Sequence, residues 1–302
     1  MRSVARAGHP LASVAPAVAA ALLSLGACAD PTGANAPTYT LLFGRAPYDS
    51  FFVADVATGE IRQRGALPAK SSRIRISPQG DRIAFNNAGL LQVLHLSDGR
   101  VLPLGTSASN MAWSPDGTRL AYVRSSDATV RIVGALGGDD VAIPGAFAGG
   151  FLGIAWSPDG RRLAFDRMRE GARVLAIVNV DGTDLQPFDP WDAASREVLL
   201  SAGEPSWSPD GKKLVFGGVM HDDFGQLQSN LWVANVATGA ARRITVEGQP
   251  ARDERPSWSP GGGYITFLRF GDVWVVRSDG TGLRQVTHTP AEQEEEPQWM
   301  RR

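Results

Sequence analysis

The sequence predicts an all-β fold of repeated four-stranded antiparallel units, and three observations support this prediction. An aromatic or apolar residue followed by Ser-Pro-x-Gly recurs along the chain. A β-rich Leu/Ile-x-aromatic triplet follows each copy and ends nine residues after the residue that begins the copy. The two ends of the chain carry complementary halves of one unit. Repeats of about 40 to 50 residues with this content indicate a closed arrangement of small sheets.

The Ser-Pro-x-Gly copies are the predicted turns between the first and second strands of each unit. Pro presets its φ angle, Asp tolerates the left-handed region, and Gly accepts a positive φ. The constant spacing of nine indicates a tight hairpin, whereas the return distance varies from 28 to 42 residues. The copies begin at Ile76, Trp113, Trp156, Trp207 and Trp258, with Trp299 as a shortened sixth copy. We interpret the motif as a structural joint rather than a repeated catalytic box.

The triplets are the predicted second strands. They lie at Leu41–Phe43, Ile83–Phe85, Leu120–Tyr122, Leu163–Phe165, Leu214–Phe216 and Ile265–Phe267. A further β-rich run follows each of them, for example Leu231 to Val236, and is the expected third strand. A second turn, such as Ala237-Thr238-Gly239, then leads to the fourth strand.

The two ends of the repeat region are expected to form one unit together. Tyr39 to Gly44 is a second strand with no first strand before it, and Glu296 to Met300 is a first strand with nothing after it. Pairing of the N-terminal with the C-terminal strand would close a ring and remove exposed strand edges. The predicted architecture is therefore a six-bladed β-propeller of four-stranded antiparallel blades, covering residues 39–302.

The first 38 residues differ in composition from the repeat region. Arg2 and Arg6 precede an apolar stretch from Leu11 to Ala27, which is the pattern of a signal peptide over residues 1–27. Residues 28–38 are rich in small residues and proline, which favours a flexible tether.

Cys28 is the only cysteine in the chain. The stretch Leu25-Gly26-Ala27-Cys28 resembles the bacterial lipoprotein box, which implies cleavage before Cys28 and lipidation of its side chain. A plain signal peptide with an incidental cysteine is the alternative. By the same resemblance, Ala29 favours sorting to the outer membrane. We expect a lipid-anchored protein of the bacterial cell envelope that faces the periplasm and contacts the membrane through its anchor only.

The composition is that of an ordinary globular protein, with 43% hydrophobic and 20% charged residues. The formal net charge is -1 and no basic stripe occurs, so nucleic acid is not an expected partner. No sequence signature of a cofactor is present, and none is predicted.

The repeats resemble those of a known family. Trp207 to Gly211 with Leu214 to Phe216, together with Val180-Asp181-Gly182-Thr183, are similar to the TolB-type propeller, the "WSPDG" class of WD40-like repeats. The resemblance covers Tyr39 to Met300 and implies fold rather than function. TolB proteins carry an α/β domain before the propeller, for which we expect no counterpart here. No Gly-x-Ser-x-Gly elbow occurs, so the hydrolase domain of prolyl oligopeptidase relatives is not expected either.

Long loops are predicted at one end of the blades only, and we call this end the long-loop face. They span residues 189–203, 218–227, 246–254 and 287–295. Long loops on a rigid scaffold often carry function. The candidate binding residues are Trp191, Asp192, His221, Asp222, Asp223, Arg252, Asp253, Glu254, Arg255, Glu295 and Glu296.

Each of these groups also has a simpler interpretation. His221, Asp222 and Asp223 are residue types that bind metals, but an exposed loop explains them too, and no metal site is predicted. Trp191 is either a stacking platform or a side chain that fixes its own loop. The charges from Arg252 to Arg255 form either an interaction patch or a solvated surface.

The residue three positions before each aromatic position is expected at the mouth of a central channel. These residues are Arg73, Asn110, Gly153, Glu204, Arg255 and Glu296. Their mixed charge argues against a symmetric metal site and suits a polar peptide.

The function that the sequence favours is a non-enzymatic, lipid-anchored envelope scaffold that binds a protein or peptide partner on the long-loop face. The alternative is a glycan-binding or glycan-cleaving propeller, a hydrolase or lyase, that uses Trp191, His221 and nearby acids. Glycosidases need two carboxylates at a defined separation, which only a structure shows. An enzyme predicts a pocket containing His221 and several carboxylates, whereas a scaffold predicts a flatter face.

Overall fold

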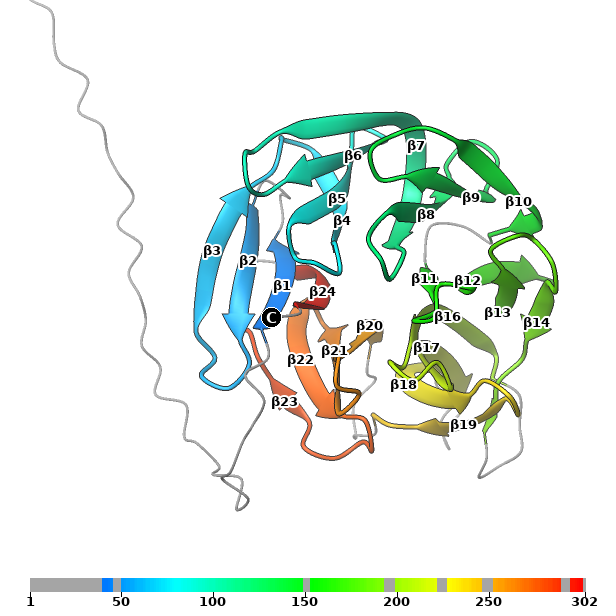
Figure 1. Ribbon diagram of the computed structural model, residues 1–302. Helices are drawn as coiled ribbons and strands as arrows, with labels where there is room; N and C mark the ends of the chain where they lie inside the picture. Colours follow the sequence, from blue (N-terminus) through cyan, green and yellow to red (C-terminus); the bar gives the residue numbers. More distant parts are fainter. Residues whose placement is uncertain are drawn as a thin grey trace, which may run out of the picture. The chain divides into compact units, whose positions relative to one another are not determined.

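The computed structural model describes residues 40–45, 50–148, 153–192, 199–221, 227–245, 252–288 and 294–300. All of them belong to one structural unit, Thr38–Arg302. The regular elements among these residues are β-strands, and they form five hydrogen-bonded sheets (Figure 1). The all-β prediction is therefore confirmed. No segment in these ranges is a helix with the length and hydropathy that crossing a membrane requires.

Three sheets have four antiparallel strands each. The first, in spatial order, consists of β24 (Glu294–Met300), β1 (Thr40–Arg45), β2 (Ser50–Asp55) and β3 (Ile61–Ala66). The second consists of β11 (Ile154–Trp156), β12 (Arg162–Arg169), β13 (Ala172–Asn179) and β14 (Gln186–Phe188). The third consists of β20 (Asp253–Trp258), β21 (Tyr264–Arg269), β22 (Asp272–Arg277) and β23 (Arg284–Gln285). In the first sheet, β1 and β24 pair through Leu41 and Trp299, so the first and last strands of the unit lie side by side.

A seven-stranded sheet joins two of the repeats. Its order is β10 (Asp140–Phe147), β9 (Thr129–Gly134), β8 (Arg119–Arg124), β7 (Val101–Trp113), β6 (Leu90–His95), β5 (Arg82–Asn87) and β4 (Ser71–Ile76). The first half of β7 pairs with β6 and its second half pairs with β8. One continuous strand therefore serves as the fourth strand of one repeat and the first strand of the next.

The remaining sheet departs from the predicted four antiparallel strands. Its order is β15 (Trp191–Asp192), β19 (Ala240–Arg243), β18 (Leu227–Asn235), β17 (Lys213–His221) and β16 (Ser201–Trp207). β15 pairs with β19 in parallel, Trp191 opposite Ala240 and Asp192 opposite Ala241. The prediction that these two residues lie in a loop is wrong, because the free edge of β19 offers backbone groups with which an extended segment can pair.

The Ser-Pro-Asp-Gly motif forms the predicted turns. In one copy, Ser114 Oγ donates to Asp116 Oδ1 at 2.6 Å and accepts from the Arg119 backbone N–H at 2.9 Å. The Gly117 N–H donates to the Ser114 carbonyl oxygen at 2.8 Å. The hydrogen bond from Ser114 lowers the pKa of Asp116 to about 2. The polar groups of the motif therefore bond within the turn, as a structural joint requires.

The aromatic residue that ends each triplet is the centre of the packing. Phe43, Phe85, Tyr122, Phe165, Phe216 and Phe267 are fully buried. Burying one such ring contributes about 2 to 3 kcal/mol relative to leaving it in water. Each lies on a second strand, where the alternation of side chains directs it between neighbouring sheets.

Candidate functional site

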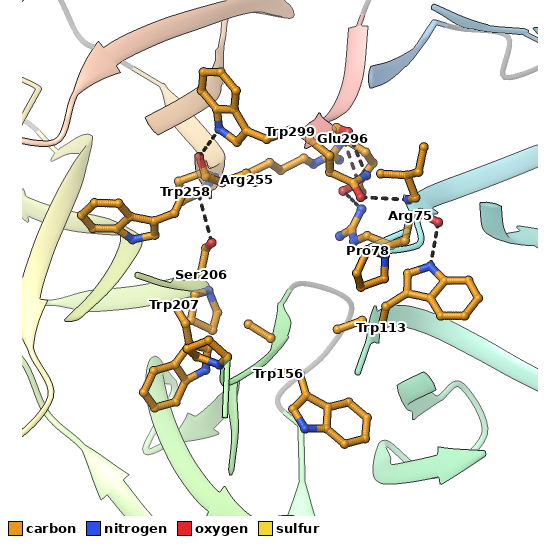
Figure 2. Close-up of a pocket in the computed structure, with 18 of the residues that line it drawn as sticks. Arg75, Pro78, Trp113, Trp156, Ser206, Trp207, Arg255, Trp258, Glu296 and Trp299 are labelled. Carbon is orange, nitrogen blue, oxygen red and sulfur yellow. Dashed lines mark hydrogen bonds and ion pairs between the residues drawn. The ribbon is translucent and has the colours of Figure 1, made fainter. Parts of the chain in front are cut away.

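A cavity of about 310 Å³ lies among the first strands of the repeats (Figure 2). Its walls come from β4, β7, β11, β16, β20 and β24 and from the turns that follow them. Two layers of side chains line part of it. The layer just before each aromatic position consists of Arg75, Ala112, Ala155, Ser206, Ser257 and Gln298. The layer at the turns consists of Pro78, Pro115, Pro158, Pro209 and Pro260.

The tryptophans of the motif lie against the neighbouring repeat, as Figure 2 shows for Trp113 and Trp299. The indole N–H of Trp113 donates to the Arg75 carbonyl oxygen at 2.9 Å, and that of Trp299 donates to Ser257 at 2.9 Å. The Arg82 guanidinium stacks 5.1 Å from the ring centroid of Trp113. Arg119 and Arg162 stack in the same way on Trp156 and Trp207. The tryptophans therefore hold adjacent repeats together.

At one end of the cavity the backbone of the first strands is bulged. Arg73, Glu204, Arg255 and Glu296 have φ angles of 54° to 57°, in the left-handed region. The strand ladders shift register at all four of these sites, and a bulge turns a side chain away from its regular direction. A left-handed non-glycine residue costs about 1 to 3 kcal/mol, so the packing around each site must hold it. We call this end the cavity mouth.

Glu296 is the most heavily paired carboxylate at the mouth, and its side chain is 3% exposed. It accepts a hydrogen bond from Arg73 Nη1 at 3.2 Å and is also paired with Arg75. Arg255 Nη1 lies 3.9 Å from Glu296 Oε1 and also pairs with Glu295. Burial by itself raises the pKa of Glu296, but the charges of Arg75, Arg255 and Arg73 together lower it to about 2. Glu296 is therefore ionised throughout the physiological range.

Glu204 lies in a different electrostatic environment. Its Oε2 accepts the backbone N–H of Arg255 at 2.7 Å. It forms no ion pair with any side chain in the described part of the chain. Burial raises the pKa of Glu204 to about 7, and the Arg255 N–H and guanidinium oppose this rise only in part. At the same mouth, the pKa of Glu296 therefore lies below the ordinary value for glutamate and that of Glu204 lies above it.

Gly153 allows the backbone of Glu204 to approach. A Cβ atom at Gly153 would lie 2.5 Å from Glu204 Cα and 2.7 Å from Pro205 Cδ. The Gly153 N–H donates to Asp166, whose side chain is 2% exposed. Burial raises the pKa of Asp166 to about 6, although Arg173 lies 3.9 Å from its Oδ2 atom.

The residues predicted for the channel mouth fall into two groups. Gly153, Glu204, Arg255 and Glu296 line the cavity. Arg73 and Asn110 do not line it, but each bonds to a residue that does: Arg73 to Glu296, and Asn110 Oδ1 to Arg75 Nη2 at 3.2 Å. Sequence reasoning missed Arg75 itself. The available signal was its place one residue before Ile76, on the face of β4 opposite the buried side chain.

The charged residues predicted before Trp258 do not act as one patch. Asp253 is fully buried and accepts both Nε and Nη2 of Arg269, at 2.6 and 2.8 Å. Arg252 is 74% exposed and lies 3.5 Å from Glu254. Only Arg255 of this stretch lines the cavity.

Trp191 was predicted to lie on the long-loop face, but the structure places it at the opposite end of its sheet. Its indole N–H donates to the Thr238 carbonyl oxygen at 3.2 Å, in the tight turn between β18 and β19. Its backbone N–H donates to Gly239 at 3.1 Å. The indole therefore fixes its own segment to this turn, as the simpler interpretation of Trp191 predicted, and does not act as a stacking platform on the long-loop face.

The other predicted residues lie apart from the cavity or outside the described ranges. His221 is exposed at the end of β17 and is not among the cavity residues. Cys28, Asp222 and Asp223 lie outside the described residues, and so does the side chain of Asp192. Within the described ranges, no three His, Cys, Asp or Glu side chains are grouped so that they could hold a metal ion.

Two solved structures share this fold. TolB from Acinetobacter baumannii has a TM-score of 0.67 and 15% identity, over 87% of this chain and 66% of that chain. An oligogalacturonate lyase in complex with manganese has a TM-score of 0.57 and 15% identity, over 83% of this chain and 74% of that chain. At these identities the likeness shows the fold alone.

Sequence comparison leads to the same family. The Tol-Pal system protein TolB of Anaeromyxobacter dehalogenans is 28% identical over 127 residues, which is 39% of this chain and 27% of that protein. The match thus spans about a quarter of the relative's length. The family described as TolB beta propeller domain matches residues 106–300. With the repeated sheets described above, this match shows that the chain belongs to the TolB beta propeller domain family.

Proposed function

We propose that the chain is a lipid-anchored scaffold of the bacterial cell envelope, which binds a protein or peptide partner at the cavity mouth on the long-loop face. The observation that carries the proposal is the mouth itself. Bulged strands direct Glu204, Arg255 and Glu296 toward a hollow of about 310 Å³, which lies at the small end of the range for binding pockets. A flatter face was expected for a scaffold and a pocket containing His221 for an enzyme, and the cavity lacks His221. A cavity of this size suits a segment of a partner rather than a folded domain.

The proposal includes a six-bladed, closed ring over residues 39–302. Its support is the order of contacts among the first strands. β4 contacts β7, β7 contacts β11, and β11, β16, β20 and β24 follow in turn. β24 also contacts β4 and pairs with β1. A closed ring would hold the mouth in one geometry before a partner arrives, which reduces the entropy lost on binding.

The anchor is proposed from residues 1–38, which comprise a signal peptide, the lipidated Cys28 and a tether. Conversion of Cys28 to Ser removes the thiol that carries the lipid. We expect this variant to leave the membrane fraction of envelopes while its fold is unchanged. An unchanged membrane fraction would refute the lipid anchor without affecting the binding site.

Blocking the cavity tests the proposed binding site. Ala155 lines the cavity, so Ala155→Trp places a large ring inside it. The matched control is Ala237→Trp in the exposed turn before β19. With each full-length protein as bait in native envelopes, we expect a partner that wild type and the control recover and that Ala155→Trp loses. Isolated binding measurements with that partner should show the same order.

Two results would count against this assignment. Equal recovery by all three baits would place the partner elsewhere on the surface. Recovery of no protein by wild type would refute the scaffold. A melting temperature of Ala155→Trp close to that of wild type is the required control, because an unfolded bait also loses partners.

The glycan-cleaving alternative has one point in its favour, the fold shared with an oligogalacturonate lyase. The cavity contains two carboxylates, Glu204 and Glu296, but His221 is not among its residues. Incubation with oligogalacturonate and manganese, followed by absorbance of unsaturated products, tests the alternative directly. Product formation that Ala155→Trp abolishes would replace the scaffold proposal with an enzyme.

A further inference from the structure

The charged groups of the cavity mouth are unequally paired. Glu296 has Arg73 and Arg75 as partners, and Arg255 pairs with Glu295. The three guanidinium groups therefore already have carboxylate partners. Glu204 lines the same cavity, and its one hydrogen-bond partner among the described residues is the backbone N–H of Arg255.

We propose that Glu204 selects a basic group, the ammonium of a lysine or the guanidinium of an arginine, in the peptide segment that enters the cavity. This inference rests on the proposed function, since it names the chemistry of the partner at that site. A cation beside Glu204 would supply the ion-pair partner that the described part of the chain does not provide. An incoming carboxylate would instead compete with Glu296 or Glu295 for guanidinium groups already in use.

The surroundings of Glu204 favour a cation over a neutral group. Three charged side chains act on Glu204 directly: Glu254 and Arg255 from β20 and Glu296 from β24. Two more contact the glycines beside it: Asp166 of β12 at Gly153 and Arg173 of β13 at Gly203. Glu254 and Glu296 add negative potential at Glu204, and Arg255 adds positive potential. Arg173 packs against Gly203 and pairs with Asp166. Glu204 is partly buried, so its carboxylate gains more from a bound cation than an exposed carboxylate does, because water screens the attraction less.

Peptide selection on the full chain tests the inference. Random seven-residue peptides would be selected on wild type, on Glu204→Gln and on Glu60→Gln. The Gln side chain can still accept the Arg255 N–H, so the first variant removes charge and keeps the hydrogen bond. Glu60 is a matched control, since it is an exposed carboxylate in the turn before β3.

We expect wild type and Glu60→Gln to select peptides with lysine or arginine at one position, and Glu204→Gln to lose that preference. A lysine peptide from the selection should bind Glu204→Gln about tenfold more weakly than wild type, as for the loss of one charge-assisted contact. Peptides without a basic position, or the same basic position on Glu204→Gln, would overturn the inference and leave the proposed function standing. Selection of no peptide by wild type would overturn both.

The pH dependence of binding supplies a second readout. A carboxyl group with a pKa of about 7 is mostly neutral at pH 6 and mostly ionised at pH 8, while lysine stays charged across this range. The affinity of wild type for the lysine peptide should therefore rise about tenfold from pH 6 to pH 8. Glu204→Gln should show no such rise, and an equal rise in both proteins would contradict the assignment of the group to Glu204.

Discussion

Arg73 and Glu296 lie 223 positions apart in the chain, yet Arg73 Nη1 donates to Glu296 Oε1 at 3.2 Å. Arg75 pairs with the same carboxylate. These contacts join β4 to β24 and thus connect the early and late repeats. These contacts stabilise the fold because Glu296 is almost fully removed from water, and a buried carboxylate needs charged partners.

Glu296→Gln should destabilise the protein by about 3 kcal/mol, because it leaves partly buried guanidinium groups without their carboxylate. Urea denaturation measures the change. Glu60→Gln is the control, since its exposed pair with Arg62 contributes little, and its unfolding should match that of wild type. Equal unfolding of all three proteins would show that the pairing is not needed for stability.

The stability conferred by Glu296 should be lost in acid. Its pKa is about 2 in the folded protein and 4.5 ordinarily, so the folded state binds this proton less readily than the unfolded state does. The contribution is therefore present above pH 4.5 and disappears as the pH falls toward 2. We expect the difference in unfolding free energy between wild type and Glu296→Gln to shrink across this window. A difference that does not vary with pH would contradict the assigned pKa.

Glu204→Gln should have the opposite effect. Because the pKa of Glu204 is raised from 4.5 to about 7, ionising it costs the folded protein stability as the pH rises through this interval. The variant avoids that cost. Its melting temperature should exceed that of wild type at pH 8, by an amount equivalent to about 1 to 3 kcal/mol, and should approach it at pH 5.

Gly153→Ala should destabilise the fold by about 2 to 3 kcal/mol, because its Cβ atom would collide with the backbone of Glu204. Gly263→Ala is the matched control, since a Cβ atom there would meet nothing within 4 Å. Thermal unfolding of both variants compares the two sites. Similar melting temperatures would mean that the backbone near Glu204 yields easily.

Trp113→Phe and Trp156→Phe isolate one hydrogen bond between repeats. Both indoles are buried and both lie under an arginine, Arg82 or Arg119. Only the Trp113 N–H has a partner among the described residues, the Arg75 carbonyl oxygen. Trp113→Phe should therefore cost about 1 kcal/mol more than Trp156→Phe in denaturant unfolding. The reverse order would mean that indole packing outweighs the hydrogen bond.

Turn chemistry made the hairpins predictable from the sequence. Ser114, Asp116 and Gly117 bond to one another and to residues next to them, so the turn needs no distant partner. The spacing of nine residues is equally local, because it places each triplet opposite the first strand of its own repeat. The added strand at Trp191 was not predictable, because its partner β19 lies about 50 residues further along the chain.

The sequence by itself determined the repeated antiparallel strands and the turns, because each depends on contacts within one repeat. The tertiary structure alone decided which carboxylates near the channel form ion pairs. Glu204 and Glu296 occupy equivalent positions in their repeats, but only Glu296 meets the guanidinium groups of β4. The neighbouring guanidinium groups lower the pKa of Glu296, whereas desolvation raises the pKa of Glu204, which has no ion pair among the described residues. Charge pairing across 223 positions depends on where the strands come together in space, and no local pattern encodes it.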